Sequence, residues 1–190
     1  PYLCQLGYSL SGIDLTSHVK ERLPDWLKSL GCRVDDFYQG DFFRHPFDRT
    51  FDLVCSFGFI EHFVHWPEVV ERHCDLVSPG GRLILTTPNF YGRVQRYLHS
   101  RLDRENYNRH NIESMRPDLW LETVVALGFE PVYSGYLGKF DFWTDDEERS
   151  LSQKLLIKLV QRLIPPGHML PAGVCSYSPH CGLVAEKKSS

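Results

Sequence analysis

The sequence predicts an α/β fold in which helices cover both faces of a mostly parallel β-sheet. Two runs, FDLVCSF at 51–57 and RLILTT at 82–87, are short and apolar, as expected of strands that are buried on both faces. Helical patterns separate the apolar runs, and glycine or proline stands at most of the junctions. Strands that alternate with helices favour parallel pairing through crossover connections.

Each element of the first part of the chain has a local signal. The expected elements are the end of a helix at 1–6, a strand that closes on Asp14, a helical pattern over 17–30, a strand over 34–38 and the strand at 51–57. Pro24 is expected to divide the helical pattern, and Gly31 to end it, because proline breaks a helix interior and glycine suits a helix end. A turn at Gly40-Asp41 should follow the strand over 34–38.

The second part of the chain continues the alternation. The expected elements are a helix opened by Pro67, the strand at 82–87, a helix from Pro117 to Gly128, a strand over 129–136, a helix over 151–163 and a last strand over 180–186. SPGG at 78–81 is predicted to be a turn. TDDE at 144–147 is predicted to be a capping box before the helix over 151–163, and Pro165-Pro166 should stop that helix.

Composition indicates a single domain over residues 1–190, with 42% hydrophobic and 24% charged residues. The formal net charge of -3 gives no reason to expect a nucleic-acid partner. No apolar run has the roughly 18 residues of a membrane helix and no leader opens the chain, so we expect a cytoplasmic protein. The six cysteines have no C-x-x-C spacing and are expected to be free thiols, with no metal site.

Four blocks in order resemble the class I S-adenosylmethionine-dependent methyltransferases, in particular the group that acts on small molecules: GIDLT, QGDFF, FDLVCSFGFIEHF and SPGGRLILTTPN. The resemblance covers residues 1–136, and the stretch from 180 onward fits that family's antiparallel last strand. It implies a doubly wound, Rossmann-like sheet with an insertion at 137–179. The family's first strand and glycine-rich loop would stand before Pro1, so we expect the natural protein to have an N-terminal segment that this sequence does not contain.

Asp14 has two interpretations from the residues alone. In the first, this carboxylate at the end of a strand is the acidic residue that holds ribose hydroxyls in nucleotide-binding folds. In the second, it only ends the strand and caps the next helix. The resemblance implies S-adenosylmethionine as the cofactor and favours the first interpretation. The cofactor-binding residues that it implies are Asp14, Leu15 and Thr16 at the ribose, Asp41 and Phe42 at the adenine, and Ser56 and Phe57 at the methionine part.

His62 and His110 are the candidate catalytic bases. Methyl transfer is an in-line displacement from a sulfonium, so the protein must align the nucleophile and, where needed, accept its proton. An imidazole titrates near the working pH. Both histidines have a structural alternative, and in the family the Glu61-His62 pair often shapes the substrate site.

An arginine-rich segment at 89–116 follows the strand at 82–87 and is interleaved with aromatic residues. We expect it to bind an anionic acceptor, such as a phosphorylated or nucleotide-linked sugar or a lipid precursor, through Arg93, Tyr107 and Arg109. Arg96 belongs to the same hypothesis. The alternative is a solvated charged helix.

The favoured function is a small-molecule methyltransferase, and two alternatives stay open. One is a cyclopropane-synthase-like lipid methyltransferase, and the other is a non-catalytic Rossmann-like module for binding or assembly. The insertion at 137–179 is expected to cover the substrate site. Its helix over 151–164 carries leucines beside Lys154, Lys158 and Arg162, which suits a membrane-surface or dimer contact, or simple docking on the domain.

Overall fold

The computed structural model describes residues 2–144, 149–163 and 170–189. They belong to two compact units, Pro1–Asp48 and Arg49–Ser190, which are described separately. The single domain expected over 1–190 therefore stays a prediction.

The first unit is a two-stranded parallel sheet with short helices. Its elements in chain order are α1 (Tyr2–Gln5), β1 (Leu10–Asp14), α2 (His18–Glu21), α3 (Leu23–Ser29) and β2 (Val34–Gln39). Pro24 divides the helical pattern as predicted, because it occupies the first turn of α3, where a missing N–H costs no hydrogen bond. Since β1 and β2 are parallel, their carboxyl ends lie at the same edge, where the Gly40 N–H donates to the Asp14 carbonyl at 2.9 Å.

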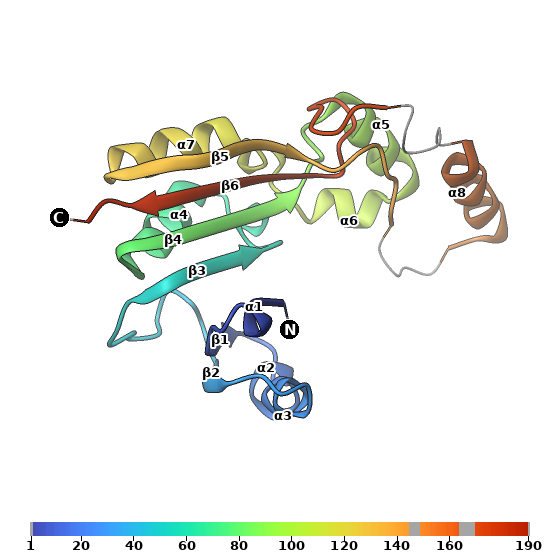
Figure 1. The fold of residues 1–190 in the computed structure, drawn as a ribbon. Helices are drawn as coiled ribbons and strands as arrows, with labels where there is room; N and C mark the ends of the chain where they lie inside the picture. Colours follow the sequence, from blue (N-terminus) through green and yellow to red (C-terminus); the bar gives the residue numbers. More distant parts are fainter. Residues whose placement is uncertain (1, 145–148, 164–169, 190) are drawn as a thin grey trace. The chain divides into compact units, whose positions relative to one another are not determined.

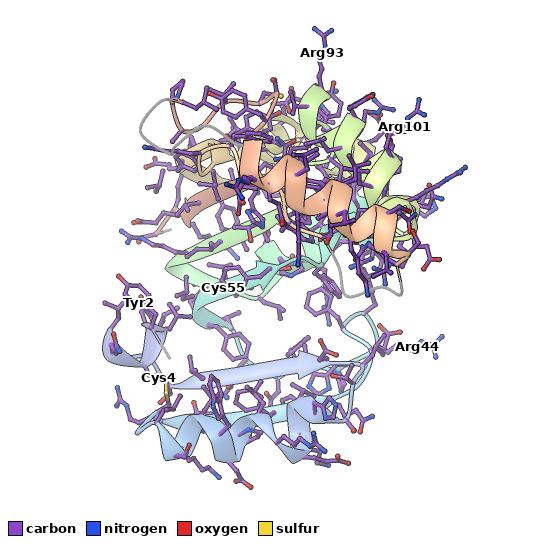
Figure 2. All side chains as sticks on the ribbon, turned by 90° about the vertical axis from the view of Figure 1, so that its right-hand side faces the viewer. Tyr2, Cys4, Arg44, Cys55, Arg93 and Arg101 are labelled. Atoms are coloured by element: carbon purple, nitrogen blue, oxygen red, sulfur yellow. A yellow bond between two sulfur atoms is a disulfide. The ribbon has the colours of Figure 1, made fainter. Side chains whose placement is uncertain are left out.

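The prediction of six free thiols is wrong for Cys4 and Cys32, which form a disulfide (Figure 2). Pairing of β1 with β2 brings the loop before β2 to the loop after α1, where the Leu10 N–H donates to the Arg33 carbonyl at 3.0 Å. The Cα atoms of Cys4 and Cys32 are 5.3 Å apart, a usual separation for a disulfide. Cys55, Cys74, Cys175 and Cys181 are free.

The second unit contains a four-stranded sheet in the order β3-β4-β6-β5 (Figure 1). Its strands are β3 (Phe51–Phe57), β4 (Val77–Pro88), β5 (Phe129–Leu137) and β6 (His180–Lys187). β3 and β4 are parallel, and β6 is antiparallel to both β4 and β5. β5 therefore runs parallel to β4, which confirms the predicted mostly parallel sheet with an antiparallel last strand.

The prediction that SPGG forms a separate turn is wrong. The segment is an irregular part of β4. Val77 pairs with Phe51 and Arg82 with Leu53, so residues 78–81 of β4 stand opposite Asp52 alone. Gly80 has a φ of 75° in this stretch. Glycine accepts that conformation without strain, and the extra residues can bulge out while pairing continues on both sides.

Helices α4 (Trp66–Asp75) and α7 (Pro117–Ala126) contact each other and pack against this sheet. The fully buried side chains of this core include Val69, Leu83, Trp120 and Leu183. Pro67 and Pro117 stand in the first turns of α4 and α7, as predicted.

The remaining elements lie at or beyond the strand ends where β3 and β4 finish (Figure 1). They are η1 (Ile60–His62), α5 (Arg93–Leu102), α6 (Arg104–Asn108), η2 (Ile112–Ser114) and α8 (Leu151–Leu163). α8 confirms the helix predicted there, whereas most of the TDDE box and Pro165-Pro166 lie outside the described residues. Within the described ranges, no helix has the length and apolar character needed to cross a membrane.

Candidate functional site

Asp14 and Asp41 follow the two strands of the first unit at their carboxyl ends. Asp14 is exposed, and its Oδ1 accepts the Thr16 N–H at 2.8 Å. Asp41 Oδ1 accepts the Phe43 N–H at 2.8 Å, and its Oδ2 lies 3.5 Å from Nε of Arg44. Each carboxylate is thus oriented by the turn that follows its own strand.

The other residues expected at the cofactor differ in exposure. Leu15 and Thr16 are exposed, and the Phe42 ring packs edge-on against Phe43 and Phe47. In the second unit, Ser56 is buried near the end of β3, whereas Phe57 is 66% exposed. Phe57 thus offers an aromatic face to a ligand, whereas Ser56 is covered by protein.

Glu61 and His62 are presented by a short connection after β3. Gly58 has a φ of 65°, which allows the chain to turn sharply, and its N–H donates to the Thr86 carbonyl at 2.9 Å. η1 follows and is anchored by Ile60, which is fully buried. This arrangement places the Glu61 side chain inside the protein and the His62 side chain at the surface.

Asn111 joins this connection to the segment that carries His110. Its N–H donates to the Glu61 carbonyl at 2.7 Å, and its side-chain amide donates to the Phe63 carbonyl at 2.9 Å. The His62 and His110 rings consequently lie with centroids 4.8 Å apart. The two histidines that the sequence nominated 48 positions apart therefore share one site with Glu61.

Glu61 is the most perturbed acid of this site. It is 1% exposed, and its Oε2 has no hydrogen-bond partner among the described residues. Burial raises the pKa of Glu61 to about 7, although a hydrogen bond from its own backbone acts in the opposite direction. The carboxyl can therefore exchange a proton near neutral pH, as a catalytic acid or base must.

The surroundings lower the pKa of both imidazoles. Burial and the Arg109 charge lower the pKa of His62, against a hydrogen bond to the Arg109 backbone. Burial is also the main cause that lowers the pKa of His110, although its Nδ1 donates to the Asn106 carbonyl at 2.5 Å. Because a carbonyl only accepts, this bond places the proton on Nδ1 and leaves a lone pair on Nε2 of His110.

Aromatic rings extend the site from His110. The Phe90 ring centroid lies 5.4 Å from that of His110, 6.1 Å from Tyr107 and 6.0 Å from Trp143. Trp143 in turn stacks on His180 at 6.1 Å, and its buried Nε1 has no hydrogen-bond partner among the described residues. The segment between β5 and β6 thus contributes to the surroundings of His110.

A buried ionic network supports α5 and α6 beside these rings. Asp103 Oδ2 accepts hydrogen bonds from His99 at 2.9 Å and Asn106 at 2.8 Å, and its Oδ1 pairs with Arg149 at 2.5 Å. Burial alone would raise the pKa of Asp103, but these partners outweigh burial and lower it. The network fixes Asn106, whose carbonyl orients His110.

The three residues expected to bind the acceptor are not all brought together. Tyr107 lies against Phe90, and its hydroxyl accepts a hydrogen bond from Arg96 at 3.2 Å. Arg109 is close enough to His62 and His110 for its charge to affect both. Arg93 is exposed and points away from the protein body, as does Arg101 (Figure 2).

Two residues of the site were not nominated from the sequence. One is Glu61, because burial and the lack of a partner for Oε2 have no local sequence signal. The other is Trp143, which lies within the insertion expected at 137–179 and whose contacts with Phe90 and His180 join residues that are distant in the chain. The site as a whole offers a buried carboxyl, two oriented imidazoles and a guanidinium beside aromatic rings.

A family model described as a methyltransferase domain matches residues 1–134. No curated protein sequence matches the chain. Many solved structures share its fold, and three of them are compared with it below. A Bacillus halodurans C-125 protein (BH2331) classed as a methyltransferase is 20% identical with a TM-score of 0.61, over 95% of this chain and 84% of that one.

The second structure is the N-methyltransferase NodS from Bradyrhizobium japonicum WM9 in complex with S-adenosyl-L-homocysteine. It is 9% identical with a TM-score of 0.53, over 94% of this chain and 66% of that one. The third, the [4+2]-cyclase SpnF, is 14% identical with a TM-score of 0.53, over 100% of this chain and 70% of that one. Because the cyclase shares the fold, the fold alone does not define the reaction.

The family model covers most of the chain, and the strand directions agree with the resemblance inferred from the four sequence blocks. The chain belongs to the methyltransferase-domain family and has the α/β fold of the class I S-adenosylmethionine-dependent methyltransferases.

Proposed function

We propose that the chain transfers a methyl group from S-adenosylmethionine to a small anionic acceptor whose nucleophilic atom lies beside Glu61, His62 and His110. The observation that carries the proposal is that His110 joins Glu61 and His62 at the connection after β3, in a chain of the methyltransferase-domain family. In open α/β sheets, ligands bind outside the carboxyl ends of the parallel strands, which is where η1 begins.

The residues of the chain fit the cofactor at two places. Asp14 is an exposed carboxylate at a strand end, and carboxylates suit the two hydroxyls of a ribose. Asp41 offers a second carboxylate for the adenine amino group, with the Phe42 ring beside it. Of the two residues expected at the methionine part, Phe57 is exposed and would contact it, whereas Ser56 is buried. The cofactor supplies a methyl group on a positively charged sulfur, which is an excellent leaving group.

The role of the protein is then to orient the acceptor and accept its proton. The acceptor's lone pair forms the new bond to the methyl carbon while the carbon–sulfur bond breaks, and the acceptor's proton leaves. Nε2 of His110 has a lone pair for that proton, and His62 offers a second, more exposed imidazole. Glu61 can relay or hold the proton because its pKa is about 7.

Arg96, Arg109 and the aromatic rings favour an anionic acceptor with a ring or apolar part. The Arg96 guanidinium donates to the Tyr107 hydroxyl, and the Arg109 charge acts on His62. A guanidinium matches phosphate or carboxylate oxygens in a forked geometry. Phe90 and Trp143 supply ring faces. A phosphorylated or nucleotide-linked sugar, or a phosphate-bearing lipid precursor, has this combination of groups.

α8 favours the lipid-precursor form of this acceptor. Leu151, Leu155, Leu156 and Leu159 are exposed, so the alternative that these leucines dock on the domain is wrong. The helix instead packs through buried Ile157 and through Gln161, which donates to the Phe142 carbonyl at 3.0 Å. Lys154, Lys158 and Arg162 flank the exposed leucines. We infer that this face contacts an anionic membrane surface, where basic side chains meet head groups and leucines enter the apolar boundary.

Methyl transfer from radiolabelled S-adenosylmethionine to a panel of small molecules tests the proposal. We expect label to enter an anionic acceptor, and His110→Gln to reduce the turnover number by 10²-fold or more, on the order of a lost general base. His65→Gln, an exposed histidine outside the site, serves as the control. Cofactor binding without transfer to any acceptor would favour the non-catalytic module, and transfer to a lipid alkene would favour the cyclopropane-synthase alternative.

A further inference from the structure

Glu61, His62 and His110 have the composition of a metal-binding site. The side-chain ligand atoms of the three residues all lie within 4.8 Å of one another. A zinc ion holds nitrogen and oxygen ligands at about 2.0–2.2 Å, which places the ligand atoms roughly 3.4 Å apart. Binding an ion would therefore require the three ligand atoms to approach one another from within 4.8 Å to roughly 3.4 Å.

Both imidazoles are oriented as metal-binding histidines are. His110 donates its Nδ1–H to the Asn106 carbonyl, and His62 has a hydrogen bond to the backbone of Arg109. A ring nitrogen that donates to a carbonyl leaves the other ring nitrogen with a lone pair, aimed in a fixed direction. Metal-ligating histidines almost always have such a second partner, commonly a backbone carbonyl. Both carbonyls belong to one short stretch, residues 106–109.

Glu61 provides an independent observation. Its side chain is 1% exposed, and Oε2 has no hydrogen-bond partner among the described residues. Buried polar atoms are nearly always satisfied, so an orphaned carboxyl oxygen requires an explanation. A divalent cation would supply both the missing bond and the opposite charge. The Arg109 charge, which acts on both histidines, repels such an ion, and the Glu61 carboxylate is the group that attracts it.

The exposure of the three residues suits a site with an open coordination position. Glu61 is buried, His110 is half-buried and His62 is exposed, so an ion could enter from the His62 side. Three protein ligands with an open position are typical of catalytic metal sites, whereas structural sites use four. Two imidazole nitrogens favour zinc, iron or nickel over magnesium or calcium, and the carboxylate oxygen also suits manganese.

We propose that Glu61, His62 and His110 bind a divalent transition-metal ion, and that its open position takes the acceptor atom to be methylated. The role of the open position in binding the acceptor rests on the proposed function, whereas ion binding does not. With the ion bound, the two imidazoles would act as its ligands in place of taking the acceptor's proton. The ion would lower the affinity of the acceptor for its proton, which would then leave to solvent.

Calorimetric titration of the chelator-treated full chain with Zn²⁺ alone, and in parallel with Mn²⁺ alone, tests ion binding. We expect one ion per chain, with affinity at least 10-fold weaker in each of Glu61→Gln, His62→Gln and His110→Gln. His65→Gln is the matched control and should bind as the wild type does. The Mn²⁺ titration controls for ion binding to the free thiols of Cys55 and Cys175, because thiols prefer softer ions than Mn²⁺.

Circular dichroism of each variant checks folding, and exposed His62 gives the variant least able to disturb the core. Absence of ion binding to the wild type, or equal affinity in folded His62→Gln and the wild type, would overturn the inference. Calorimetry with S-adenosylmethionine on the same samples separates the two proposals. Cofactor binding without ion binding would refute the metal site alone, and ion binding without cofactor binding would refute the proposed function alone.

Discussion

At the scale of single residues, the chemistry of the site depends on groups whose surroundings alter their ordinary behaviour. Glu61 is an acid kept from water, and His110 is an imidazole whose proton is assigned by the Asn106 carbonyl. Neither property is visible in the sequence, where the two residues are 49 positions apart. The sequence predicted His62 and His110 from their titration range, and the structure adds the carboxyl that completes the group.

Arg109 and Arg93 provide a matched pair for testing recognition of an anionic acceptor. Arg109→Ala removes a guanidinium beside the imidazoles, so we expect KM for the acceptor to rise 10-fold or more, in line with about 1.5–3 kcal/mol for a hydrogen bond to a charged group. Arg93→Ala removes the same charge where the side chain points away from the protein, and its KM should be unchanged. Steady-state kinetics measure both, and equal KM values would refute recognition by Arg109.

His73 should make stability depend on pH. Burial lowers the pKa of His73 in α4 below its ordinary value of 6.5, despite a 2.7 Å hydrogen bond to the Val69 carbonyl. The unfolded chain therefore binds the proton more readily, so the free energy of unfolding falls as pH drops through 6.5. Urea unfolding at pH 7.5 and at pH 5.5 measures this change. From the higher to the lower pH, the free energy of unfolding should fall less in His73→Gln than in the wild type. An equal loss in both proteins would contradict this role.

At the scale of elements, local signals predicted helices and strands well where proline or glycine marks their ends. Pro24, Pro67 and Pro117 stand in first turns, and Gly128, with a φ of 84°, follows α7. The SPGG segment was predicted wrongly because the pairing of β3 with β4 on both sides keeps an irregular stretch within the strand. Tertiary pairing of this kind has no signal in four residues of sequence.

α8 gives the prediction that belongs to this scale. Replacing Lys154, Lys158 and Arg162 by alanine should weaken binding to vesicles that contain phosphatidylserine by roughly 100-fold, from about 1 kcal/mol per basic residue. Replacing Leu151, Leu155 and Leu159 by serine should also reduce binding, whereas Lys139→Ala should not. Vesicle co-sedimentation measures each variant. If the wild-type chain does not sediment with these vesicles, the membrane contact is refuted.

At the scale of the whole molecule, the order of the sequence blocks predicted the fold class that the family match and the strand directions confirm. Block order could do so because each block is a strand end or a turn with a fixed place in a parallel sheet. The Cys4–Cys32 disulfide and the contacts of Trp143 could not be predicted, since they join segments through the packing of the chain. The proposed acceptor site likewise draws its side chains from several elements and has no single motif.

The most direct test of the central claim is calorimetric titration of the full chain with S-adenosylmethionine, in the wild type and in two aspartate variants. We predict that the wild type binds the cofactor and that Asp14→Ala weakens binding by about 1–3 kcal/mol, the range for leaving a buried polar group without its hydrogen-bond partner. Asp48→Ala removes the same charge from an exposed position of the same unit and should bind as the wild type does. Absence of binding to the wild type, or equal affinity in Asp14→Ala and Asp48→Ala, would contradict the account.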